Sequence, residues 1–133
     1  MDFKELASHN LPILIDYGSE TCPPCQVMAA DLKKFHDDTK EKAFVKFVNL
    51  TEYPLAANNV PVQVLPTQIL FSKDGKPFVP SKQLAGRIPL TQYNSKATGE
   101  HTFTVHHGIL TYDQMQELLK EMGGIVVAGS SFK

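Results

Sequence analysis

The amino-acid sequence predicts an α/β fold in which helices flank a mixed central sheet and an extended β-hairpin is inserted late in the chain. Two apolar runs, at residues 11–17 and 43–50, are each followed by a helical pattern, and this alternation is typical of parallel strands. A polar turn at 73–76 and two strand-like runs at 88–93 and 101–107 are signals of antiparallel hairpins. The expected order after a short first helix is therefore β–α–β–α–β–β–α.

Length and composition are those of a single globular domain. The chain has 133 residues, and we place the domain at residues 1–122, with a C-terminal tail at 123–133. The net charge of −1 gives no electrostatic reason to expect a nucleic acid as partner. No run approaches the ~20 apolar residues of a membrane span. We therefore expect a monomer without a membrane span.

The N-terminus bears on the compartment. Residues 1–4 lack the basic region and the following apolar region of a secretory signal. As written, the sequence predicts a cytoplasmic protein. If an export signal has been removed, it predicts a periplasmic or extracytoplasmic one.

The first half of the chain alternates between helical and strand patterns. The run at 11–17 is nearly continuous in apolar residues, as expected for a central strand covered on both faces, and Asp16 alone interrupts it. In the next helix we place Met28 and Phe35 in the core and His36 in solvent. The expected elements are a helix at 2–9 with Phe3 and Leu6 inward, a strand at 11–17, a helix at 23–38 with Val27, Met28, Leu32 and Phe35 at core spacing, a strand at 43–50, a short helix at 54–59 and a strand at 60–71.

The second half of the chain is least regular between residues 77 and 100. Its last helix is the best defined, because Thr111 is a good N-cap and Gly123-Gly124 a good C-terminal signal. The expected elements are the turn at 73–76, a helical turn at 81–85, strands at 88–93 and 101–107 around a polar turn at 94–100, and a helix at 112–122 with Met115, Leu118 and Leu119 inward.

The only two cysteines stand in the motif Cys22-Pro23-Pro24-Cys25, where the first strand is followed by the long helix. Unpaired N–H groups and the helix dipole at a helix N-terminus favour a thiolate, and they lower a cysteine pKa from ~8.5 to about 3.5–7.5. A zinc site and a static disulfide are the alternatives. A zinc site normally has four ligands, whereas no second cysteine pair is present. A static disulfide between Cys22 and Cys25 would close a loop so small that it constrains the unfolded chain little. Redox exchange, with no metal and no cofactor, is therefore the preferred interpretation.

The sequence resembles the thioredoxin family in four features that occur in the family's order. They are the core strand Ile13–Tyr17 with its buried acid Asp16, the pair Cys22 and Cys25, the loop Leu65-Pro66-Thr67, and Gly108 before Thr111. The resemblance covers about residues 11–76 and 105–122. It implies a thioredoxin-like fold and a cis peptide bond before Pro66.

Four departures from the family pattern suggest a specialised relative. Thr21 replaces the family's tryptophan, Pro23 replaces its usual glycine, and Phe47, with Lys46 beside it, falls where a lysine is often found. The connection from Gly75 to Gly108 is also longer than the family minimum by roughly two dozen residues, and insertions of that size are often functional. We assign residues 77–104 to an inserted hairpin region.

The two cysteines are expected to have different roles. Cys22, at the helix N-terminus and more exposed, is the expected nucleophile, and Cys25, one turn further on, would resolve the mixed disulfide. Asp16 is the candidate base for the Cys25 proton, because burial on an apolar strand raises a carboxyl pKa above ~3.9. The alternative is an exposed aspartate at a strand end.

The surface around Cys22 is the expected binding site for an extended stretch of substrate, which would pair with the Leu65 backbone as an added strand. Neighbours on a strand alternate, so either His106 or His107 points toward this surface, and we favour His107 because it adjoins Gly108. A cationic imidazole there would favour the Cys22 thiolate, and the alternative is two solvated histidines. The expected substrate-binding residues are Thr21, Pro23, Pro24, Leu65, Pro66, His107 and Gly108.

The predicted function is that of a thiol–disulfide oxidoreductase acting on protein disulfides and regenerated by a reductant partner. Neither residue between the cysteines is a histidine, which favours a reductant over a strong oxidant. The alternative is a binding module, in which the scaffold presents the inserted hairpin and the cysteines form a structural disulfide or a soft-metal site.

Overall fold

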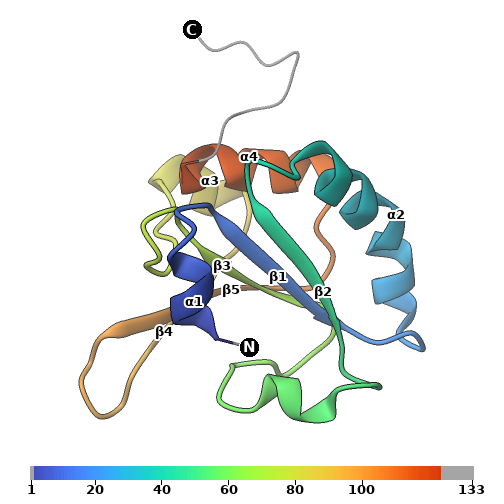
Figure 1. Cartoon of the computed structure of the whole chain (residues 1–133), viewed down its shortest axis with the longest axis horizontal. Helices are drawn as coiled ribbons and strands as arrows, with labels where there is room; N and C mark the ends of the chain where they lie inside the picture. The colour runs from blue at the N-terminus through green and yellow to red at the C-terminus, as the bar shows by residue number, and fades with distance from the viewer. Residues whose placement is uncertain (1, 124–133) are drawn as a thin grey trace, which may run out of the picture.

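The computed structural model describes residues 2–123 (Figure 1). After the first helix the order is β–α–β–α–β–α–β–β–α, which has one strand and one helix more than the predicted order. Most of the predicted C-terminal tail, from residue 124 onward, lies outside the described residues. The elements are α1 (Phe3–Ala7), β1 (Ile13–Gly18), α2 (Pro23–Asp38), β2 (Phe44–Asn49), the 3-10 turn η1 (Pro54–Ala57), β3 (Thr67–Phe71), α3 (Lys82–Arg87), β4 (Thr91–Asn94), β5 (His101–His107) and α4 (Tyr112–Met122).

The five strands form one mixed sheet in the order β2-β1-β3-β5-β4. β1 and β2 are parallel, as predicted, whereas β3 runs antiparallel to β1, so the prediction of parallel pairing was wrong for this strand. The connection explains the difference. β2 ends level with Gly18 of β1, and β3 starts at the same end of β1, on its other side, where Thr67 pairs with Tyr17. A parallel strand would have required a crossover along the sheet.

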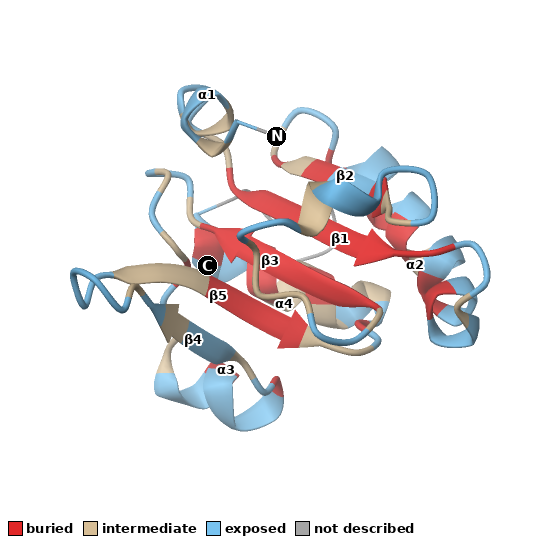
Figure 2. Cartoon of the chain, turned by 90° about the horizontal axis from the view of Figure 1, so that it is seen from below, coloured by how far each residue is buried: buried red, intermediate tan, exposed pale blue. Residues whose placement is uncertain are grey.

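Helices cover both faces of the sheet (Figure 1): α2, α3 and α4 lie on one face, and α1 and η1 on the other. Buried apolar side chains form one cluster on each face. Figure 2 shows the consequence: β1, β3 and residues 104–106 of β5 are buried, while β4 lies at an exposed edge. An α/β fold with a mixed sheet flanked by helices is therefore confirmed.

α2 begins at the predicted residue and buries one narrow stripe. Cys25, Met28, Leu32 and Phe35 recur every three or four residues and are all buried. Val27, predicted to share this face, is 69% exposed, because it lies one position away from the stripe and therefore about 100° around the helix axis. α4 also has its predicted bounds, with a capping box between Thr111 and Gln114.

The segment at 77–104 contains more helix and less strand than predicted. α3 extends to Arg87 from its N-cap Ser81, and β4 begins at Thr91 rather than at residue 88. β4 pairs with β5 as the predicted antiparallel hairpin. Arg87 forms an ion pair with Glu117 of α4, which fastens the segment to the helical layer.

Two further details differ from the sequence predictions. The strand predicted at 60–71 begins only at Thr67, because the chain before it forms the loop around Pro66. The helix predicted at 54–59 is a 3-10 turn that ends at Ala57. Within residues 2–123, none of the helices has both the length and the apolar character needed to cross a membrane.

Candidate redox site

The cysteine pair lies at the junction between β1 and α2. Cys22 is the N-cap of the helix, and its Sγ accepts a hydrogen bond from the backbone N–H of Cys25 at 3.2 Å. The two sulfurs form a disulfide, with the Cα atoms 5.2 Å apart. Cys22 is half-buried, whereas Cys25, one turn into the helix, is only 8% exposed. The predicted difference in exposure between the two cysteines is confirmed.

The loop before the cysteines is held by its own polar side chains. Ser19 Oγ accepts hydrogen bonds from the Thr21 backbone N–H and from the Thr51 hydroxyl, each at 3.1 Å. The side chain of Gln26 donates to the Glu20 carbonyl, and Asn49 donates to the Glu20 carboxylate. Thr21, Pro23 and Pro24 are exposed around Cys22.

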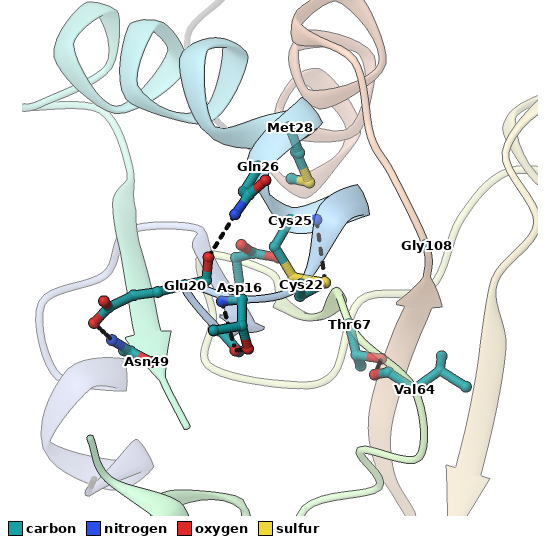
Figure 3. The surroundings of a disulfide bond; sticks show 12 residues. Asp16, Glu20, Cys22, Cys25, Gln26, Met28, Asn49, Val64, Thr67 and Gly108 are labelled. Carbon is teal, nitrogen blue, oxygen red and sulfur yellow. Dashed lines mark hydrogen bonds between the residues drawn. A yellow bond between two sulfur atoms is a disulfide. The ribbon is translucent and has the colours of Figure 1, made fainter. Parts of the chain in front are cut away.

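A second loop lies beside the disulfide, and Figure 3 shows Val64, Thr67 and Gly108 among its surroundings. The Leu65–Pro66 peptide bond is cis, as the resemblance implied. The Gly108 N–H donates to the Pro66 carbonyl at 2.7 Å, and the Thr67 hydroxyl donates to the Val64 carbonyl at 2.7 Å. Gly108 adopts φ +104°, which L side chains rarely adopt, and so glycine suits this junction. This hydrogen bond brings together Gly108 and Pro66, two of the residues predicted to bind substrate.

Asp16 lies beneath the cysteines and is only 2% exposed, so the alternative of an exposed strand-end aspartate was wrong. Gln68 Nε2 donates to Asp16 Oδ1 at 2.8 Å. Burial raises the pKa of Asp16 to about 6, and the hydrogen bond from Gln68 opposes part of that rise. A carboxyl group with this pKa changes protonation state near neutral pH, which suits a general base.

Gly18 allows the Cys25 sulfur to approach β1. A Cβ atom at Gly18 would lie 3.0 Å from Cys25 Sγ and 2.8 Å from Cε1 of Phe47. Phe47 pairs with Asp16 in the parallel register, which places the aromatic ring where the family often has a lysine. Asp16, Cys25 and Phe47 line a groove of about 620 Å³ between α2 and β2, which connects the buried carboxyl with the surface.

The two histidines lie on opposite faces of the sheet, and the role predicted for His107 beside Cys22 stays a prediction. His106, not His107, lies on the Asp16 face of the sheet, where its Nδ1 is 2.7 Å from Gln68 Oε1. His107 lies on the opposite face, and its two ring nitrogens are 3.1 Å from the Thr67 hydroxyl and 3.2 Å from the Tyr93 hydroxyl. No hydrogen bond joins either histidine to Cys22 within residues 2–123.

Two hydrogen-bonded sets therefore flank the sheet near the cysteines. We call Asp16, Gln68 and His106 the buried network, and Thr67, His107 and Tyr93 the outer network. Sequence reasoning missed Gln68 and His106 as parts of the site. One signal for Gln68 was available, because a glutamine within an apolar central strand needs buried hydrogen-bond partners.

Three residues of the site are thus brought together as predicted, namely Cys22, Cys25 and Asp16, and the loop containing Pro66 and Gly108 lies beside them. In the described part of the chain, no three side chains of His, Cys, Asp or Glu are close enough together to hold a metal ion. The described site thus combines one cysteine pair with one buried acid.

Comparisons with known proteins identify the family. The family model described as Thioredoxin matches residues 2–97. Thioredoxin from Alicyclobacillus acidocaldarius is 32% identical over 95 residues, which are 71% of this chain and 87% of that protein. The chain belongs to the thioredoxin family.

Chloroplastic relatives are similar over a shorter part of their length. Thioredoxin Y1 of Arabidopsis thaliana is 37% identical over 89 residues, which are 62% of this chain and 51% of that protein. The chain thus spans about half the length of this relative.

Solved structures agree with the fold at lower sequence identity. Chloroplastic thioredoxin z has a TM-score of 0.61 at 17% identity, covering 92% of this chain and 90% of its own. Fasciola hepatica thioredoxin has a TM-score of 0.55 at 18% identity, covering 88% of each chain. The thioredoxin-like fold predicted from the sequence is confirmed.

Proposed function

We propose that this protein reduces disulfide bonds in other proteins by thiol–disulfide exchange, with Cys22 as the nucleophile and Cys25 as the resolving cysteine. The observation that carries the proposal is the asymmetry of the pair. Cys22 is half-buried at the helix N-terminus, and Cys25 is nearly enclosed and lines the same groove as Asp16. Membership of the thioredoxin family supports the same activity.

The first step uses the position of Cys22. In the reduced protein, the backbone N–H of Cys25 and the positive end of the α2 dipole favour the Cys22 thiolate. The thiolate attacks one sulfur of the substrate disulfide, so that a Cys22–substrate bond forms and the substrate S–S bond breaks. The leaving sulfur departs as a thiolate and takes a proton from water.

The second step uses Asp16. The carboxylate takes the proton of the Cys25 thiol, and the resulting Cys25 thiolate attacks Cys22. The Cys22–Cys25 bond forms, the Cys22–substrate bond breaks, and the reduced substrate leaves. A reductant partner that donates two electrons and two protons then restores the dithiol.

The substrate surface in this proposal consists of the exposed residues around Cys22 together with the cis-proline loop. An extended substrate strand would pair with the backbone of Leu65, next to Pro66 and Gly108. His107 contributes indirectly, because it bonds Thr67, which in turn bonds the Val64 carbonyl within this loop. The remaining surface residues are Thr21, Pro23 and Pro24.

The proposal also covers the domain organisation, the location and the direction of exchange. We propose a monomeric single domain at residues 1–122, in which residues 77–104 are an insertion relative to the family pattern, and a cytoplasmic location. The absence of histidine between the cysteines favours the reducing direction.

Reduction of insulin by dithiothreitol tests the proposal. Wild-type protein is expected to accelerate the appearance of turbidity catalytically, and Cys22→Ser to be indistinguishable from dithiothreitol alone. Wild-type protein without acceleration would favour the alternative of a binding module. The Cys22–Cys25 reduction potential, measured against glutathione and thioredoxin standards, would then decide the direction, with a value near that of thioredoxin (about −270 mV) expected for a reductant.

A further inference from the structure

We propose that Gln68 and His106 are positioning residues for Asp16, holding its carboxylate so that one oxygen is always hydrogen-bonded and the other is free to receive the Cys25 proton. The inference rests on the proposed function for its role in exchange. Its structural content concerns the ionisation of Asp16 and is testable without turnover.

The buried network is continuous across three strands. Gln68 Nε2 lies 2.8 Å from Asp16 Oδ1 and 3.0 Å from the Gly108 carbonyl, and Gln68 Oε1 lies 2.7 Å from His106 Nδ1. The sulfur of Met28, at 3.5 Å from Nε2, is a weaker contact. Gln68 is 0% exposed and His106 is 6% exposed, so water competes little for these bonds.

The Gly108 carbonyl determines the orientation of the Gln68 amide. A backbone carbonyl only accepts hydrogen bonds, so the Gln68 atom beside it must be the NH₂ group. Gln68 Oε1 then faces His106 and needs a donor, which requires a hydrogen on His106 Nδ1. Because Gly108 is a backbone group, this orientation is the same whether or not Asp16 is ionised.

The proton acceptor on Asp16 follows from this orientation. Oδ1 accepts from Gln68 in both ionisation states, so the proton taken from Cys25 goes to Oδ2. Among residues 2–123, no group donates a hydrogen bond to Oδ2, and this atom is not fully enclosed. Asp16 and Cys25 both line the groove between α2 and β2. In the step itself, the Cys25 S–H bond breaks, an Oδ2–H bond forms, and the charge moves from the carboxylate to the sulfur.

The network also affects how readily Asp16 ionises. Donation from Gln68 stabilises the carboxylate and opposes the rise in the pKa of Asp16 caused by burial. His106 holds the amide without adding charge, because burial, with a smaller contribution from nearby His107, lowers the pKa of His106 to about 4. The other titratable groups near Asp16 are Cys25 and, along the groove, Glu20, Lys33, His36, Asp37 and Lys46.

Titration of the oxidised protein tests the proposal. With both cysteines in the disulfide, the carbon-13 carboxyl signal of Asp16, assigned with Asp16→Asn, reports the carboxyl group without thiol titration. Gln68→Met removes the donor at nearly constant volume and is expected to raise the Asp16 midpoint by about one pH unit, a tenfold loss of acidity, because hydrogen bonds to charged groups are among the stronger ones. His106→Leu is expected to raise the midpoint by less, and His106→Asn, which keeps a donor near Gln68 Oε1, to restore it.

Thr104→Val is the matched control. Thr104 is 0% exposed and lies two residues from His106 on the same face of β5, where it bonds the Phe78 carbonyl rather than Asp16. This variant is expected to lower stability and leave the Asp16 midpoint unchanged. An unchanged midpoint in Gln68→Met, or an equal rise in Thr104→Val, would overturn the proposal.

A second variant covers the case in which Gln68→Met does not fold. The double variant Gln68→Met/His106→Leu removes both polar side chains, so neither is left without its partner. It is expected to raise the Asp16 midpoint at least as much as Gln68→Met. Because these titrations use the oxidised protein, they decide the positioning role even if wild-type protein does not reduce insulin. The insulin assay in turn decides the proposed function even if the midpoints do not move.

Discussion

The buried and outer networks begin at neighbouring residues on the same strands, yet they have different environments. Gln68 and His106 point toward α2 and α4, whereas Thr67 and His107 point toward the opposite face. The buried network reaches the acid beside Cys25, and the outer network joins the cis-proline loop to β4 through Tyr93. The alternation of side chains along a strand therefore places neighbouring residues of β3 and β5 in two different networks.

The comparison has an energetic side. A buried acid is costly when ionised, whereas the outer network consists of uncharged hydroxyl groups and a half-buried histidine. Ionised Asp16 therefore lowers the stability of the fold, and its carboxyl group changes protonation state near neutral pH. We expect changes at the cysteines and Asp16 to alter the chemistry most, and changes in the outer network to alter it least.

The largest effects are expected at the cysteines. Cys22→Ser should abolish insulin reduction, because no nucleophile remains at the helix N-terminus. Cys25→Ser should accumulate mixed disulfides with partners, because the second exchange step is lost. Mass spectrometry of proteins captured by each variant under non-reducing conditions measures the difference. Equal capture by Cys25 in the Cys22→Ser protein would reverse the two roles.

Asp16→Asn is expected to stabilise the oxidised protein above pH 6 by about 3 kcal/mol. The carboxyl pKa is about 6 in the folded protein and 3.8 as its ordinary value, so the folded state holds this proton more tightly. Stability associated with the protonated acid is complete below pH 3.8 and is lost as the pH rises through 6. The free energy of unfolding in urea, measured from pH 4 to pH 8, should therefore show a growing advantage for Asp16→Asn that levels off above pH 6. A constant difference across that range would contradict the buried, raised-pKa assignment.

Gly18→Ala should destabilise the protein by about 1–3 kcal/mol, because the added Cβ would overlap Phe47 and press on Cys25 Sγ. Gly86→Ala is the matched control. Gly86 lies within α3, and a Cβ there would meet nothing within 4 Å, so this change should be neutral or stabilising by up to about 1 kcal/mol. Thermal unfolding of the two oxidised variants measures the contrast. Equal melting temperatures would mean that the close approach of β1 to the disulfide is not constrained.

The smallest effect on chemistry is expected at His107. His107→Ala removes two hydrogen bonds from the outer network and should lower stability by about 1 kcal/mol. The rate of Cys22 alkylation as a function of pH should superimpose on that of the wild type, because the His107 nitrogens face Thr67 and Tyr93. A displaced alkylation curve would show that His107 tunes the Cys22 thiol, as the sequence alone had suggested.

Local sequence signals predicted most of the helices and the core of the site. Helix α2 was predicted at its observed bounds from apolar spacing and Pro23, and α4 from Thr111 and Gly123. The family motif placed Asp16 beneath the cysteines and Pro66 in a cis bond. These features depend on residues close together in the sequence or on a pattern shared by a family.

The features that sequence reasoning missed depend on contacts between distant residues. The antiparallel direction of β3 follows from a loop that starts and finishes at the same end of β1, and loop paths have no periodic signal. The histidine facing Asp16 depends on the register between β3 and β5, and a shift of one residue would exchange His106 for His107. Val27 was misplaced because its hydrophobicity suggested burial, whereas 69% of it is exposed near the N-terminus of α2.

The rate at which Cys25 resolves a mixed disulfide on Cys22 tests directly whether Asp16 is the base. A mixed disulfide formed with a peptide thiol, followed by release of the peptide in a single turnover, gives this rate from pH 5 to pH 9 for wild type and Asp16→Asn. We predict that the wild-type rate rises through a midpoint near pH 6, where Asp16 ionises, and that Asp16→Asn lacks this rise and is slower by about 10²-fold or more at pH 7. Superimposable profiles for the two proteins would show that Asp16 is not the base and would contradict the account.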